Sequence, residues 1–316
     1  MPSLTTYRQT SARRLGSYAE GTATSGSTSS IIEIATSPFI STIEQDDRYT
    51  DWWVMVPAAV AAADRVARRV KEGDASTGQF TIDNPVTTTP NGLAVEFHGL
   101  VEPYTEMRRL INDTLKLCLV MTTSTFTVAD ADDYRHSLAA ITSLTKPEWI
   151  YQVGYLTSSD DIDEDDPFIL SRLQRGRAYE RNGIIYLHGF RHNTSDTMYV
   201  LWSRPAYTYI RASSAGAFGD TTAGLTSTEA NEAKPDAEWV AAGVKMLAWD
   251  ELGQQFAPGD NTRVQAMRKE AADQFRALSR SHFKPPRRYI EVPDTPSRDW
   301  GPASMAAGRQ PLGLAR

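Results

Sequence analysis

The sequence has little cysteine, no long apolar run and no excess of positive charge. Its one cysteine, Cys118, rules out an intrachain disulfide and a zinc site built from several cysteines. No run of 18 apolar residues occurs, and residues 1–6 lack the apolar core of a signal peptide, so we expect neither a membrane span nor secretion. The net charge of −6 at pH 7 argues against a dedicated DNA-binding protein, because such proteins are usually strongly basic.

The short motifs that mark common catalytic and metal sites are also missing: there is no P-loop, G-x-S-x-G, H-E-x-x-H or C-x-x-C. His188 and His192 straddle a predicted strand and a turn, which favours surface histidines over a metal site. The acidic run 160–166 begins like a calcium loop, but Asp166 stands where that loop needs glycine and Arg172 where it needs glutamate. We therefore expect no metal, no cofactor and no enzymatic activity.

Two groups of arginines could contact phosphate, but the many acidic residues favour solvated arginines in ion pairs. These groups are Arg65, Arg68 and Arg69, and Arg172, Arg175 and Arg177. The aromatic residues of 149–155 and 199–209 could form a sugar-binding platform. At alternate strand positions, however, aromatic residues more commonly pack in a core.

What is present fits a globular protein. Hydrophobic residues make up 41% and charged residues 23% of 316 positions, which is enough chain for two domains or for one domain with a large insertion. Residues 1–98 predict a β-rich domain that follows a short helix at 7–15. Its expected strands are residues 31–34, 52–56, 79–83 and 93–97. The segment 57–70 stays open between helix, which its alanines favour, and strand, which its surroundings favour.

A corner at residues 97–103 leads into the most helix-like stretch, residues 104–120. Pro103 suits a first helical turn, since its missing N–H would have no partner there. An apolar stripe recurs at helical spacing and consists of Met107, Leu110, Ile111, Leu115 and Cys118. The stripe predicts that Cys118 is a buried, unreactive thiol.

Residues 124–210 predict a β-rich insertion, with strands at 123–128, 147–155, 184–188 and 198–202. The last two flank a turn at 191–196, which indicates a hairpin. The small polar residues of 211–235 predict a flexible loop or an arm that orders against a partner.

Two amphipathic helices follow, with faces containing Trp239 to Leu252 and Val264 to Leu278. The short connector 256–260 predicts antiparallel packing. With residues 99–123 they would form one helical body, 99–123 and 236–283, in which Leu110, Ile111 and Leu115 pack on the hairpin. Residues 284–316 are rich in proline and predict an extended arm; from Arg280 onward seven Arg or Lys oppose three Asp or Glu. The expected fold is thus α+β.

Four passages, taken in order, resemble a family of virion structural proteins of tailed bacteriophages, the head-to-tail connector (neck, adaptor) class. They are residues 21–28 with Trp52 to Val56; the Glu96 to Pro103 corner with Arg108 to Asn112; Pro147 to Ile150 with a hairpin ending near Arg204 and Pro205; and the helices Trp239 to Phe256 and Asn261 to Ser279. One departure is the alanine-rich stretch Ala58 to Ala63, where relatives show strand-like sequence.

This resemblance implies a ring, expected as a dodecamer, docked beneath the portal and above the tail in the virion neck. Its partners would be copies of itself, the portal protein and a tail or further neck protein, with genomic DNA crossing the lumen without sequence-specific binding. A net negative charge fits such a channel. The loop 211–235 and the C-terminal arm would reach neighbours. The interface residues expected in the arm are Lys284, Arg287, Arg288, Tyr289, Ile290 and Trp300.

Other functions stay open. A tail-tube or tail-hub protein is the nearest rival. A tail-associated cell-wall hydrolase would need carboxylates, for which Glu148, Asp163 and Glu180 are candidates. A glycan-binding module would use aromatic residues such as Trp149 and Trp202.

Overall fold

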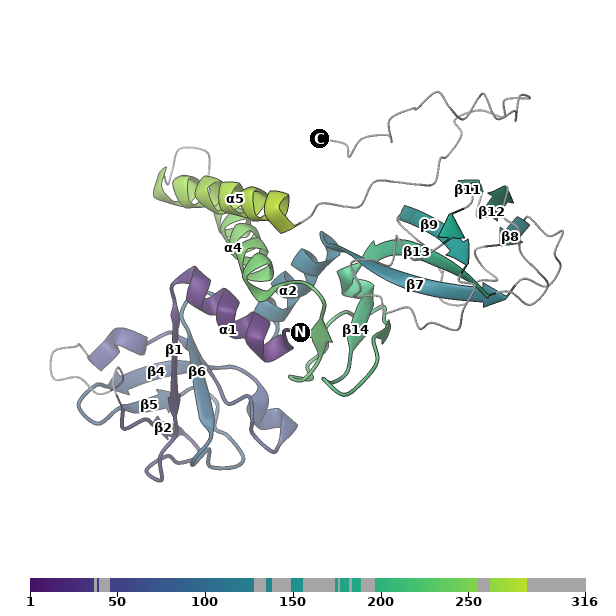
Figure 1. Ribbon diagram of the computed structural model, residues 1–316. Helices are drawn as coiled ribbons and strands as arrows, with labels where there is room; N and C mark the ends of the chain where they lie inside the picture. Colours follow the sequence, from purple (N-terminus) through teal and green to yellow (C-terminus); the bar gives the residue numbers. More distant parts are fainter. Residues whose placement is uncertain are drawn as a thin grey trace. The chain divides into compact units, whose positions relative to one another are not determined.

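The computed structural model describes residues 1–36, 39, 46–127, 135–137, 149–155, 174–175, 177–181, 184–188, 197–254 and 262–282. These residues contain four α-helices and antiparallel sheets, so the fold is α+β (Figure 1). The chain forms two compact units. The first comprises Met1–Cys118 and Ala206–Phe283, and the described part of the second lies within Leu119–Pro205.

A six-stranded antiparallel sheet forms the β domain of the first unit, with the order β1-β6-β3-β4-β5-β2. Its strands are β1 (Tyr18–Thr22), β2 (Ile31–Glu33), β3 (Trp53–Met55), β4 (Arg68–Asp74), β5 (Gln79–Ile82) and β6 (Ala94–His98). Four buried aromatic rings, those of Phe39, Tyr49, Phe80 and Phe97, pack with centroids 5.0–5.8 Å apart. Burial of these rings supplies much of the hydrophobic stabilisation of the domain.

The ambiguous segment 57–70 forms neither a continuous helix nor a continuous strand. A short 3-10 helix, η2 (Ala62–Arg65), is followed by β4, which begins at Arg68. Hydrogen bonds of a buried carboxylate explain why no continuous helix forms. Asp64 is buried and accepts hydrogen bonds from Thr87 and Thr88, and these bonds hold the segment against residues 87–88 despite the helix propensity of its alanines.

Helix α1 (Leu4–Leu15) contains the predicted segment 7–15 and begins earlier. The hydroxyl of Ser3 accepts a hydrogen bond from the Thr6 N–H and caps its N-terminus. The helix ends at Gly16, whose φ of 76° is the left-handed conformation that glycine adopts without strain.

Helix α2 (Glu106–Lys116) carries four of the five residues of the predicted apolar stripe, and the fifth, Cys118, follows its end; all five are buried. The helix is shorter than the predicted 104–120. At its start, the Glu102 carboxylate accepts hydrogen bonds from the N–H groups of Tyr104, Thr105 and Glu106, so Pro103 lies in a turn before the helix. At its end, Leu119 already begins a strand, because the β-branched residues that follow pair along a ladder.

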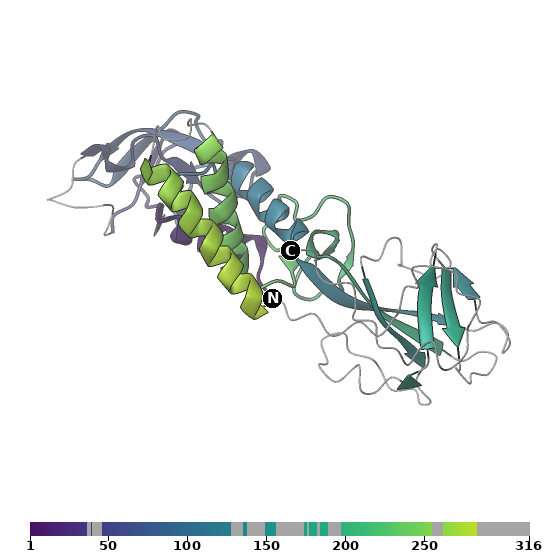
Figure 2. The ribbon, with the colours of Figure 1, turned by 90° about the horizontal axis from the view of Figure 1, so that it is seen from above.

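Helices α4 (Ala237–Gln254) and α5 (Thr262–His282) form the predicted antiparallel pair and lie side by side (Figure 2). The rings of Trp239 and Phe275 are 5.0 Å apart near one end. Near the other, Nε of Arg268 donates to Asp250 at 2.6 Å. Both α1 and α2 pack against α4, as predicted for α2.

The segment after the second unit is not the loose loop or arm expected for 211–235. It contains η4 (Ala206–Thr208), β14 (Tyr209–Arg211), β15 (Gly219–Asp220) and β16 (Glu232–Ala233). Leu225 is buried, and the Asn112 side chain binds both its N–H and its C=O. These contacts fix the segment against its own chain. Residues 206–210 accordingly fall in the first unit, although the sequence places them in the insertion.

The second unit contains two antiparallel sheets. One has the order β10-β9-β13-β7 and the other β11-β12-β8. The strands are β7 (Leu119–Thr127), β8 (Arg135–Ser137), β9 (Trp149–Tyr155), β10 (Gln174–Arg175), β11 (Arg177–Arg181), β12 (Ile184–His188) and β13 (Thr197–Pro205). The predicted strands are therefore present.

The hairpin predicted between 184–188 and 198–202 is wrong. β12 pairs with β11 and β8, whereas β13 pairs with β7 and β9. Arg181 lies opposite Ile184, so only Asn182 and Gly183 connect β11 to β12. Asn-Gly between two strands is a strong sequence signal for a hairpin with a two-residue loop. β12 therefore pairs with β11, the strand just before it in the sequence, and not with β13.

Candidate functional site

The six expected interface residues of the C-terminal arm, Lys284 to Trp300, lie outside the described residues. The same holds for Glu148, for His192, for the acidic run 160–166 and for Arg172. The site that can be built from the described residues is a different one. It is a network of polar and charged side chains beside α1, which we call the α1 network: Arg8, Glu96 and His98, which are buried, and Glu229, which is partly exposed.

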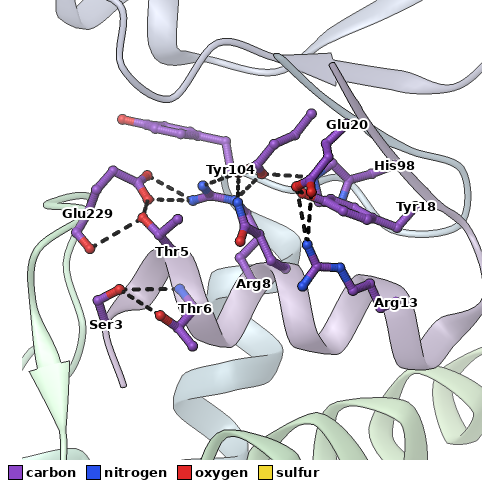
Figure 3. A network of polar contacts seen from close by, with 12 residues as sticks. Ser3, Thr5, Thr6, Arg8, Arg13, Tyr18, Glu20, His98, Tyr104 and Glu229 are labelled. Atoms are coloured by element: carbon purple, nitrogen blue, oxygen red, sulfur yellow. Dashed lines mark hydrogen bonds and ion pairs between the residues drawn. The ribbon is translucent and has the colours of Figure 1, made fainter. Parts of the chain in front are cut away.

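Arg8 is the centre of this network. It lies on the inner face of α1 and is only 2% exposed. Its Nε and Nη2 donate to the two carboxylate oxygens of Glu96 on β6, at 2.8 and 3.1 Å. Its Nη1 donates to both oxygens of Glu229, at 2.8 and 2.7 Å. Figure 3 shows Arg8 between Glu229 and His98. One guanidinium therefore joins three segments of the first unit: α1, β6 and the chain before β16.

Glu96 has two more donors. His98, on the same face of β6, places its Nε2 3.2 Å from Oε2 of Glu96, and Gln9 Nε2 donates to Oε1 at 2.9 Å. Burial opposes ionisation of Glu96, but the hydrogen bonds from His98 and Arg8 outweigh it and lower the pKa of Glu96 to about 2. This carboxylate is therefore ionised throughout the physiological range.

His98 is buried as deeply as its partner. Burial lowers the pKa of His98, although the hydrogen bond to Glu96 acts in the opposite direction. The Tyr18 ring contacts the imidazole edge-on, with centroids 5.3 Å apart. A neutral imidazole that donates from Nε2 to Glu96 fits this geometry, since a second charge would lie beside Arg8.

An exposed rim surrounds the network. Arg13 donates to both oxygens of Glu20 at 3.2 Å, and the Tyr18 hydroxyl donates to Glu20 at 2.6 Å (Figure 3). Arg13 and Glu20 are each about half exposed. Solvent screens this outer pair, so it contributes much less to stability than the inner one.

A carboxylate beside an imidazole can serve as an acid–base pair where it faces a substrate. Here Glu96 and His98 are each 1% exposed and enclosed by α1, β1 and their own strand. The arrangement instead ties α1 to the β domain electrostatically. Two buried charges are costly to desolvate, and each offsets this cost for the other. Removing one partner leaves the other charge buried without a counter-charge, which destabilises the fold.

The sequence relates two residues of this network, Glu96 and His98, but not their partner Arg8. Glu96 lies in the predicted strand 93–97, and His98 follows the end of that prediction. Because β6 extends to His98, the two residues share a face. Their partner Arg8 is 88 positions from Glu96, and the sequence alone gives no reason to pair them. Arg8 looks like an ordinary polar residue of an amphipathic helix.

The structure also places other residues that the sequence singles out. Arg69 is exposed and pairs with Asp51, as expected of a solvated arginine. Arg68 also forms an ion pair, with Asp64, but it is buried and not solvated. Cys118 is buried, and burial raises its pKa to about 12, as expected of an unreactive thiol. Trp202 is 1% exposed and donates to the Ser124 hydroxyl, which removes it as a sugar platform.

No cluster of three or more His, Cys, Asp or Glu side chains that could hold a metal occurs among the described residues. Within the same part of the chain, no helix combines the length and the apolar character that a membrane crossing requires. No family model matches the sequence, and no curated protein is significantly similar to it.

Proposed function

We propose that the protein is a structural component of a tailed-bacteriophage virion, a ring at the neck that joins the portal to the tail and surrounds the DNA passage. The observation that carries the proposal is the order of the four passages that resemble head-to-tail connector proteins. The described parts of these passages overlap defined elements. The first includes the end of β1 and all of β3, the second the end of β6 and part of α2, the third the start of β9 and the end of β13, and the fourth most of α4 and α5. In the third passage, β13 pairs with β7 and β9 instead of forming the expected hairpin.

The first unit has the properties that a ring subunit needs. Its β domain is joined to three packed helices, α1, α2 and α4, and the α1 network connects the N-terminal helix to the sheet. The second unit and the C-terminal arm are then available for the portal or the tail.

Purified protein tests the proposal directly. Sedimentation should give a species of several copies, expected to be twelve, and negative-stain electron microscopy should show closed rings that bind the portal protein. A stable monomer without affinity for the portal would contradict it. Antibody labelling of intact particles shows whether the protein lies at the neck or at the tail tube or hub, which are the nearest alternative positions.

A further inference from the structure

The six-stranded sheet has two edge strands, β1 and β2, and the described residues cover only one of them. Residues of an antiparallel strand bind its two sides alternately, so every second residue of an edge strand directs its N–H and C=O away from the sheet. Such groups form a template on which another chain can add a strand, and native proteins usually cover or disrupt them.

The β2 edge is covered. β2 directs the backbone groups of Ile31 and Glu33 outward, and the turn before the strand binds all four of them. The Ile31 N–H donates to the Thr28 hydroxyl at 3.1 Å, and its C=O accepts from the Thr28 N–H at 2.8 Å. The Glu33 N–H donates to the Ser27 hydroxyl at 3.0 Å, and its C=O accepts from the Thr24 N–H at 2.8 Å. This edge is closed to a further strand.

The β1 edge is open. Ser17 and Ala23, just outside the two ends of β1, bind the chain of β6, so the alternation directs the backbone groups of Tyr18, Glu20 and Thr22 away from the sheet. Within the described part of the chain, nothing donates to or accepts from these six groups. β1 also has no lysine, no proline and no bulge, which are common means of protecting an edge.

The C-terminal arm contains one stretch with the sequence of a β-strand. Residues 287–292 read Arg-Arg-Tyr-Ile-Glu-Val, and their Tyr, Ile and Val have high β propensity. No other isoleucine or valine occurs in residues 284–316. Pro286 and Pro293 delimit the stretch, so it is about as long as the five-residue β1. It contains four of the six expected interface residues: Arg287, Arg288, Tyr289 and Ile290.

The two faces of this stretch match the two faces of β1. Ala19 packs against the aromatic core of the β domain, whereas Tyr18 and Glu20 lie on the opposite face of the strand. In an extended chain Ile290 and Val292 share one face. With these two side chains beside Ala19, an added strand would extend the core, and its other face would continue the polar outer surface.

A second copy of β1 fits the open edge less well. Two β1 strands paired symmetrically about their middle residue would bring Glu20 opposite Glu20, and like charges directly opposite are unfavourable. Such a two-fold contact also gives dimers, not a ring. Glu20 already accepts hydrogen bonds from Arg13 and Tyr18 (Figure 3). Pairing with the arm therefore depends on backbone groups and apolar side chains, not on a new ion pair.

We infer that residues 287–292 of one copy add a strand to the β1 edge of the next copy, an inference that rests on the proposed ring. Main-chain hydrogen bonds supply the affinity of such a strand addition, and alternate side chains supply its specificity. The edge and the arm are different surfaces, so the contact is head-to-tail, and head-to-tail contacts generate rings when the rotation closes. The chain after Pro293, which includes Trp300, stays available for the portal.

A proline substitution tests the pairing at the edge. Glu20→Pro removes an outward N–H and leaves the hydrogen bonds between β1 and β6 in place, since edge strands tolerate proline at such positions. The subunit dissociation constant should rise about tenfold or more, because a main-chain hydrogen bond is lost and the pyrrolidine ring obstructs the added strand. The matched control, Glu20→Thr, removes the same carboxylate but keeps the N–H, and it should assemble like the wild type. Circular dichroism checks that both variants fold.

Disulfide cross-linking tests whether the arm is the occupant. Thr22 is exposed, so Thr22→Cys should leave the fold intact, and the native Cys118 is buried and stays silent. Ile290→Cys, on the face assigned to the core, is the control partner and should give no cross-link with Thr22→Cys. A ladder of covalent multimers should form on oxidation when Thr22→Cys is combined with at least one of Arg287→Cys, Tyr289→Cys and Glu291→Cys.

Hydrogen exchange tests the same contact without a substitution. The amides of Tyr18, Glu20 and Thr22 should exchange rapidly in dilute subunits and slowly in the ring. Those of Ile31 and Glu33 are bound by their own turn and should be equally protected in both states.

The outcomes separate the inference from the proposed function. Rings that leave the three β1 amides unprotected and tolerate Glu20→Pro would overturn the inference and leave the proposed function standing. Protection without cross-links to the arm would show that another strand occupies the edge, and disulfides formed only within single chains would show that the arm binds its own subunit; either result overturns the inference. A wild-type chain that stays monomeric would overturn both.

Discussion

Arg8 and Glu96 form a two-pronged ion pair that is almost completely buried, although 88 positions separate them in the sequence. Glu229 extends the pair to a third segment. The N-terminal helix is therefore attached to the β domain by charge as well as by apolar packing.

Removing Arg8 should strongly destabilise the first unit. Arg8→Met leaves Glu96 buried without its main counter-charge, and we expect a loss of about 3–5 kcal/mol in the free energy of unfolding. Urea unfolding followed by circular dichroism measures it. The control is Arg13→Met, which breaks the half-exposed pair with Glu20 and should cost no more than about 1 kcal/mol. Equal effects of the two substitutions would show that burial of the Arg8 pair is unimportant.

The buried imidazole should make stability depend on pH. The pKa of His98 is lower in the folded chain than in the unfolded chain, so the unfolded state binds the proton more readily. Stability should therefore fall as the pH drops below about 6.5, the ordinary pKa of histidine. His98→Gln can still donate to Glu96 but does not titrate. Unfolding measured between pH 7.5 and 5.5 should be less pH-dependent in this variant, and an unchanged slope would contradict the assignment.

The contact between α2 and α4 requires a glycine. A Cβ at Gly243 would lie 2.3 Å from Cγ2 of Thr114 and 3.0 Å from Cε2 of Phe275. Gly243→Ala should therefore cost about 1–3 kcal/mol through overpacking, although alanine is the better helix former. Gly253→Ala in the same helix is the control, because its Cβ would meet only the flexible Arg268 side chain, at 3.0 Å. Thermal unfolding should lower the melting temperature for the first variant and leave that of the second unchanged or raised.

Cys118 should be chemically silent in the folded protein. It is buried, and its pKa is raised to about 12, so the reactive thiolate is scarce at neutral pH. A thiol reagent such as Ellman's reagent should react with it only in denaturant. Rapid modification of the native chain at pH 7 would mean that the end of α2 opens readily.

Truncation after Phe283 tests the six expected interface residues of the C-terminal arm. Because the truncation leaves every described residue in place, the unfolding transition should be unchanged, whereas portal binding or ring assembly should weaken. A truncated chain that fails to fold would show that the arm belongs to the structural core. One that folds and assembles normally would remove these residues from the interface.

Local patterns predict most of the secondary structure. The apolar stripe of α2, four strands of the β domain (β2, β3, β5 and β6) and the antiparallel helices α4 and α5 each follow from spacing within a short window. Strands β1 and β4 were not predicted. α2 ends early because β-branched residues from Leu119 onward pair with β13, a strand some eighty residues later. The hairpin error also has a local cause, since the Asn182-Gly183 pair connects β12 to the strand before it.

Long-range polar contacts cannot be predicted in the same way. Nothing near Asn112 indicates that its amide holds Leu225, and nothing near Asp64 indicates that Thr87 and Thr88 bind it. The first contact orders a segment whose composition suggests a loose loop, and the second orders a segment whose alanines favour a helix. Buried polar groups need specific partners, and those partners are set by the tertiary fold.

The proposed ring between portal and tail has a direct test in a cryo-electron microscopy map of the assembled particle. We expect a ring at the neck, with density on each subunit that accommodates the six-stranded sheet together with α1, α2, α4 and α5. Density for the chain along the tail tube or at its tip, with none at the neck, would contradict the proposal.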